Sequence, residues 1–180
     1  MVEHFNDINQ NQIWLGLLVL RVSVGITMIA HGYNHIYRGG KIKGTAGWFA
    51  SLGMKPGILH AWLASLTELA AGLGLVFGLL TPLAAGAIFG VLAVALITNH
   101  RKAGFFVFRR PTEGWEYLMN LLAACVAIGC VGPGRWSLDN AIGFHPGGWW
   151  GLGIVLVIGV GGTVALLAVF WRPPAPAPAT

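Results

Sequence analysis

The sequence predicts an all-α membrane protein: an antiparallel four-helix transmembrane bundle followed by a fifth, C-terminal transmembrane helix. Of its 180 residues, 56% are hydrophobic and only 9% are charged, whereas soluble domains carry about 25% charged residues. The mean hydropathy is +0.70. Apolar stretches close to the roughly 20 residues that span a hydrocarbon core recur along the chain, and short loops between them hold most of the basic residues.

The apolar stretches predict helices at about 13–36, 57–80, 82–100 and 114–131, which we assign to one membrane domain of residues 1–140. Trp14 lies where the first helix enters the bilayer, and Tyr33 and Tyr37 lie near its exit, which suits aromatic side chains that prefer the membrane interface. Between 80 and 82 only a tight antiparallel turn fits, with Pro82 in the first helical turn. Residues 141–172 add the fifth transmembrane helix, and 173–180 form a Pro/Ala-rich flexible tail.

The basic residues predict an orientation in the membrane. The loops after the first and third helices contain four each, namely Arg38, Lys41, Lys43 and Lys55, and Arg101, Lys102, Arg109 and Arg110. On the other side the loops contain only Arg135. Because positive charge favours the cytoplasmic side, we expect a multi-pass protein of the bacterial plasma membrane with its N-terminus outside and its C-terminus in the cytoplasm. The net charge of +5 is therefore expected to face lipid headgroups, with no nucleic-acid partner.

Two charged residues stand inside apolar stretches. Glu68 lies near the middle of 57–80, and Arg21 is the basic residue in the interior of 13–36. In antiparallel neighbouring helices they would lie about 6 Å apart along the membrane normal, so we expect them to form an intramembrane ion pair. Two interpretations stay open: a structural pair that locks two helices, or a polar pocket that holds a ligand or relays protons, since ionisable groups inside membranes are often functional.

Three further residues are candidates for the same site. His31 and His35 are four residues apart and share a helix face, as in some metal sites. A complete site needs further ligands, and no spacing selects His60 or His100, so we expect neither metal nor haem. Glu116, one turn inside the fourth helix, either interacts favourably with the helix dipole or joins Arg21 and Glu68. The catalytic residues, if there are any, are not identified by a motif.

Several of these residues also carry a family resemblance. Several motifs resemble the DoxX family of small bacterial membrane proteins. They are Arg21 with Gly25, His31-Gly32, Gly47-Trp48-Phe49, Glu68 with its following small residues, Gly78-Leu-Leu-Thr-Pro-Leu-Ala-Ala, Glu116 and Gly132-Pro-Gly-Arg-Trp-Ser-Leu-Asp139. The resemblance runs from about 15 to 140. It implies a four-helix bundle and relatives in redox complexes, including the membrane subunit of thiosulfate:quinone oxidoreductases. The fifth helix and the tail depart from the family pattern.

Three functional interpretations follow. The first, which we favour, is a subunit of a quinone-linked or thiol/sulfur-linked membrane complex rather than a stand-alone enzyme. A quinone or small sulfur compound would bind near Arg21, Glu68 and His31, with no covalent cofactor, and partner subunits would supply the electron carriers. The second is a non-catalytic structural or assembly subunit, in a larger complex or a homo-oligomer. The third, a proton-coupled transporter using Glu68, is disfavoured because no inverted repeat or broken helix is evident.

Overall fold

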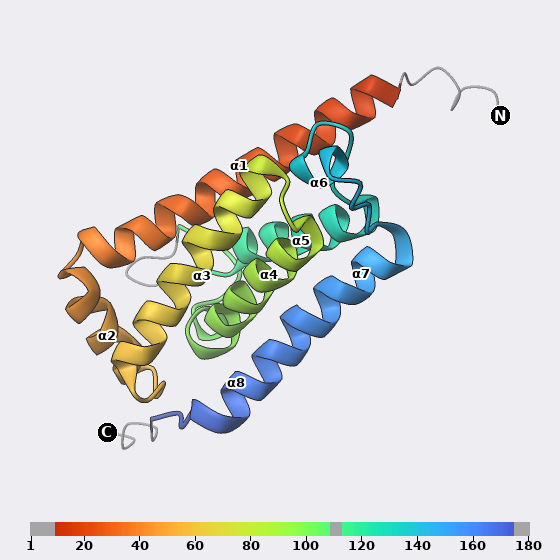
Figure 1. The fold of residues 1–180 in the computed structure, drawn as a ribbon. Coiled ribbons are helices and arrows are strands. Elements are labelled where there is room, and N and C mark those ends of the chain that lie inside the picture. The colour runs from red at the N-terminus through yellow and green to blue at the C-terminus, as the bar shows by residue number, and fades with distance from the viewer. Residues whose placement is uncertain (1–9, 109–112, 175–180) are drawn as a thin grey trace.

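The computed structural model describes residues 10–108 and 113–174. Within them the chain is almost entirely helical, and the predicted all-α architecture is confirmed (Figure 1). The helices are α1 (Gln10–Tyr37), α2 (Lys41–Ser51), α3 (Gly57–Phe77), α4 (Thr81–Thr98), α5 (Glu116–Val131), α6 (Leu138–Ala141), α7 (Gly148–Leu156) and α8 (Gly162–Phe170). A 3-10 turn, His100–Lys102, follows α4, and a π-helical segment, Val157–Gly161, joins α7 to α8. The predicted N-terminal tail before residue 10 and the end of the Pro/Ala tail from 175 onward lie outside the described residues.

Among the described residues, four helical segments are long and apolar enough to cross a membrane: α1, α3, α4 and the continuous run α7–α8 from Gly148 to Phe170. The predicted fourth span, 114–131, is the shorter helix α5 of 16 residues, which is about 24 Å long at 1.5 Å per residue. Large apolar side chains cover the outside of the bundle, as Val157 (73% exposed) and Val164 (61%) illustrate. A surface of this kind suits lipid rather than water, because lipid carries no penalty for apolar contact. The protein is a membrane protein.

Helix α4 is the centre of the bundle. It is apolar on all sides, and Leu83 is the one residue between Thr81 and Thr98 that is largely exposed, as expected for a helix surrounded by others. It packs against α3, α5 and the whole of the α7–α8 run, and Figure 1 shows it (green) between α3 and α7–α8. Gly86 permits the approach of the last of these, since a Cβ there would lie 3.2 Å from the Cα of Val155.

Glycines also bring α1 and α3 together. A Cβ on Gly25 would lie 2.6 Å from the carbonyl oxygen of Gly72, and one on Gly32 would lie 2.8 Å from that of Ser65. Small residues at such positions let two backbones touch, which is how membrane helices pack closely. The pairings run in opposite directions along the two helices, so α1 and α3 are antiparallel neighbours (Figure 1).

The end of α8 is attached to the connection between α2 and α3. Met54 and Trp171 form an isolated antiparallel bridge, the Trp171 indole donates a hydrogen bond to the Leu52 carbonyl at 3.0 Å, and the Arg172 amide donates to the Gly53 carbonyl at 2.9 Å. These bonds hold the fifth span against the first four at this end of the bundle.

Candidate functional site: a buried histidine–glutamate pair beside an intramembrane cavity

A cavity of about 390 Å³ lies inside the bundle. Its wall is built from α1, α2, α3, α4, α5 and the π-helical segment with α8, and most of it is apolar. A volume of this size is within the range of small-molecule sites, about 300–1,000 Å³. The polar and aromatic-hydroxyl side chains on the wall are His31, His35, His60, Thr67, Glu68, Thr98, Asn99, His100, Glu113, Tyr117 and Thr163.

The closest charged contact on this wall joins His35 of α1 to Glu68 of α3. Nδ1 of His35 lies 3.0 Å from Oε2 of Glu68, and both side chains are largely buried, at 18% and 5% exposure. Neither of these two atoms has a well-aligned hydrogen bond to another protein group. The contact therefore brings together an imidazole nitrogen and a carboxylate oxygen that can hold one proton between them, and the carboxylate keeps further lone pairs for a ligand.

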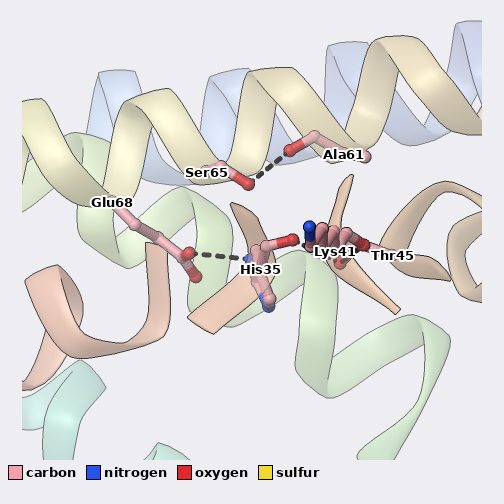
Figure 2. A network of polar contacts seen from close by, with 6 residues as sticks. All are labelled: His35, Lys41, Thr45, Ala61, Ser65 and Glu68. Carbon is pink, nitrogen blue, oxygen red and sulfur yellow. Dashed lines mark hydrogen bonds and ion pairs between the residues drawn. The ribbon is translucent and has the colours of Figure 1, made fainter. Parts of the chain in front are cut away.

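The surrounding backbone fixes the position of His35. The Thr45 hydroxyl in α2 donates a hydrogen bond to the His35 carbonyl at 2.8 Å, and a longer one to the Lys41 carbonyl at 3.3 Å. On the facing helix, the Ser65 hydroxyl donates to the Ala61 carbonyl at 2.6 Å. Figure 2 shows the two side chains pointing toward each other from separate helices, with Thr45 next to His35. Helix α2 thus positions the C-terminal end of α1.

The predicted ion pair between Arg21 and Glu68 is not formed. With Gly25 opposite Gly72, Arg21 is four residues to one side of this crossing and Glu68 is four residues to the other. In antiparallel helices these offsets add, so the two residues are about 12 Å apart along the axis rather than the predicted 6 Å. Glu68 instead contacts His35.

Arg21 belongs to a separate polar cluster near the other end of α1. Its guanidinium donates to the carbonyl oxygens of Leu75 and Trp136, at 2.7 Å in each case. Asp139 is fully buried, acts electrostatically on Arg21, and accepts hydrogen bonds from the backbone amides of Leu80 and Thr81, at 2.7 and 2.8 Å. A carboxylate on the first amides of α4 is favourably placed with respect to that helix dipole. This cluster joins the segment 136–139 to α1, α3 and α4.

Of the other predicted site residues, one lies on the cavity wall and one does not. His31 lies on the cavity wall with His35 and Glu68. Glu116 does not: its Oε1 accepts from the Val107 amide at 3.2 Å, in the first turn of α5. Two interpretations of Glu116 were left open. Its position in the first turn of α5 agrees with an interaction with the helix dipole, and Glu116 does not join Arg21 or Glu68.

Sequence reasoning missed part of the wall. Tyr117 gave no signal of its own, and His60 and His100 could not be distinguished from other histidines near helix ends. They meet the cavity only because α3, α4 and α5 converge there. Within the described ranges, no group of three or more His, Cys, Asp or Glu side chains is arranged to hold a metal ion.

Residues 16–101 match the model of the DoxX family. This match confirms the resemblance to the DoxX family over that segment. The matched segment contains both members of the His35–Glu68 pair and most of α1, together with α2, α3 and α4. The walls contributed by α5 and α8 lie beyond it. No curated protein and no solved structure matches the chain significantly.

Proposed function

We propose that this protein, which resembles the DoxX family, is a membrane subunit that binds a small redox compound in its cavity. A quinone or a small sulfur compound fits this proposal. Partner subunits in a bacterial plasma-membrane complex would carry the electrons, as the family resemblance implies. The observation that carries the proposal is the buried His35–Glu68 contact on the wall of a mostly apolar cavity.

The energetics of the membrane support this proposal. A carboxyl group within a transmembrane helix is costly, by several kcal/mol, and such groups tend to be kept where they serve a ligand or a proton. The His35–Glu68 pair has lone pairs and a proton to offer, and the apolar wall suits the rest of a lipid-soluble molecule. Arg21, by contrast, donates its hydrogen bonds to backbone carbonyls and does not line this cavity.

Binding of decylubiquinone to the purified protein in lipid nanodiscs tests the proposal. We expect measurable binding by calorimetry, and a loss of about tenfold or more in affinity in Glu68→Gln and His35→Ala, because a hydrogen bond to a charged group contributes about 1.5–3 kcal/mol. Glu116→Gln is the matched control, since it removes a glutamate that is not on the cavity wall, and it should bind like the wild type.

Two results would contradict the proposal. One is wild-type affinity in folded Glu68→Gln and His35→Ala. The other is an absence of binding by the wild type, both of decylubiquinone and of thiosulfate. Co-purification of the ligand-free protein with a larger complex would then favour the structural or assembly role.

A further inference from the structure

A second polar contact, between His100 and Tyr117, lies on the wall formed by the end of α4 and the start of α5. The His100 side chain is buried, at 8% exposure, and both residues line the cavity. The Tyr117 hydroxyl oxygen lies 3.1 Å from Nε2 of His100, and Nδ1 of His100 lies 2.8 Å from the backbone carbonyl oxygen of Glu113. Each ring nitrogen of His100 therefore has a partner of its own.

The chemistry of these partners assigns the protons. A carbonyl oxygen can only accept, so Nδ1 of His100 carries the hydrogen that it donates to Glu113. A neutral imidazole has one N–H, so its Nε2 has a lone pair and accepts from the Tyr117 hydroxyl. The Tyr117 proton is thereby committed to His100, and the Tyr117 oxygen can offer a ligand only its lone pairs.

The carbonyl that sets this arrangement is held by the backbone around it. The Trp115 amide donates to the Gly104 carbonyl at 3.2 Å, and the Glu116 amide donates to the Phe105 carbonyl at 3.0 Å. Gly114, directly before Trp115, leaves no room for a side chain, since a Cβ there would overlap the Phe105 carbonyl oxygen. The segment 113–116 is thus docked on 104–105, and this docking fixes which nitrogen of neutral His100 is protonated.

Two threonine hydroxyls on the cavity wall also donate their protons to partners within the protein. Thr98 donates to the Val94 carbonyl at 2.8 Å, and Thr163 donates to the Gly159 carbonyl at 2.6 Å. Like Tyr117, these two hydroxyls present oxygens that accept hydrogen bonds and have no free proton.

We propose that the part of the cavity beside Tyr117 favours ligand groups that donate a hydrogen bond, such as the hydroxyl of a phenol or hydroquinone, over oxygens that can only accept. Tyr117, held by His100, is the accepting group on this wall. The inference rests on the proposed function to the extent that a ligand occupies the cavity, and it adds the hydrogen-bonding class of that ligand.

A matched pair of probes tests this selectivity: 4-nonylphenol and its methyl ether, in which a methyl group replaces the hydroxyl proton. Binding is measured by calorimetry in nanodiscs at pH 8.5, where imidazole side chains are ordinarily neutral and phenols remain protonated. We expect the wild type to bind the phenol about fivefold or more tightly than the ether, the range for one net hydrogen bond. Tyr117→Phe should reduce the difference to about twofold or less. Tyr37→Phe, which removes an exposed hydroxyl away from the cavity, should leave the preference intact.

A second variant addresses the role of His100. In His100→Phe the edge-to-face ring contact with Tyr117 can persist, but the Tyr117 proton is free to donate, so affinity for the ether should rise toward that for the phenol. Equal affinity of the wild type for both probes, or an undiminished preference in folded Tyr117→Phe, would overturn this inference while leaving the cavity as a binding site. Binding of neither probe would overturn the inference, and failure of decylubiquinone and thiosulfate as well would overturn the proposed function with it.

Discussion

At the scale of single residues, the two charges buried in the first and second spans have different partners and different roles. Arg21 donates two hydrogen bonds to backbone carbonyls and interacts electrostatically with Asp139. Glu68 contacts His35 beside the cavity. Separated groups of this kind act on stability independently, because coupling requires contact or a shared network.

A double-mutant cycle checks this separation. Arg21→Met should lower the free energy of unfolding in detergent by about 2–4 kcal/mol, since it leaves the carbonyl oxygens of Leu75 and Trp136 without their donor. Combined with Glu68→Gln, the losses should add to within about 0.5 kcal/mol, whereas combined with Asp139→Asn they should deviate by about 1 kcal/mol or more. Denaturant titration followed by circular dichroism gives each value. Strong coupling of Arg21 to Glu68 would show that the two residues interact after all.

At the scale of the elements, the contact between α1 and α3 decides the site. Gly25 and Gly72 face each other at backbone distance, and Gly32 lies against Ser65 in the same groove. This register places His35 within reach of Glu68 and takes Arg21 out of its reach. The first two predicted spans are therefore antiparallel neighbours, as the ion-pair prediction assumed, but the alignment of α1 along α3 differs from the predicted one.

Alanine substitutions test the closeness of this contact. Gly25→Ala should destabilise the protein by about 1–3 kcal/mol, because the new Cβ would require α1 and α3 to separate. Gly16→Ala is the control in the same helix: a Cβ there meets nothing within 4 Å. It should leave stability unchanged or raise it by up to about 1 kcal/mol through helix propensity. Thermal unfolding in one detergent compares the two, and equal effects would contradict the close packing.

At the scale of the whole molecule, basic residues from distant parts of the sequence meet at one end. The Arg172 amide bonds to Gly53, two residues from Lys55, and the Arg101 guanidinium lies 5.9 Å from the centre of the Trp171 ring. Arg135, in contrast, bonds to Asn11 at 3.5 Å, near the start of α1. The first loop, the loop after α4 and the end of α8 are thus on a common side, as the orientation argument requires. Arg109 and Arg110, which also entered that argument, lie outside the described residues.

The orientation itself is a prediction for intact cells. In a background with Cys125 and Cys130 replaced by alanine, a membrane-impermeant maleimide added from outside should label a cysteine at Ile142 and should not label one at Lys43 or Ala103. Positive charge retained in the cytoplasm is the physical reason. Permeabilised cells, in which all three positions should react, provide the control. Labelling of Lys43 or Ala103 in intact cells would reverse the assignment.

The sequence by itself determined the class of this protein, the positions of its apolar helices and the residues able to carry charge inside the membrane. These are local properties: composition, the length of an apolar run and the chemistry of a side chain. The second predicted helix, 57–80, is α3 ending at Phe77, and the third, 82–100, is α4 ending at Thr98, with a 3-10 turn at His100.

Only the tertiary structure decided which polar groups meet. The register of α1 on α3 depends on backbone contacts at Gly25, Gly32 and Gly72, and a shift of a few residues changes the partner of every ionisable group on those helices. The convergence of α4 and α5 on the cavity brings His100 to Tyr117, two residues that no spacing in the sequence connects. Local chemistry names the candidates, whereas helix packing pairs them, because an interaction between two side chains depends on a distance that a linear pattern does not contain.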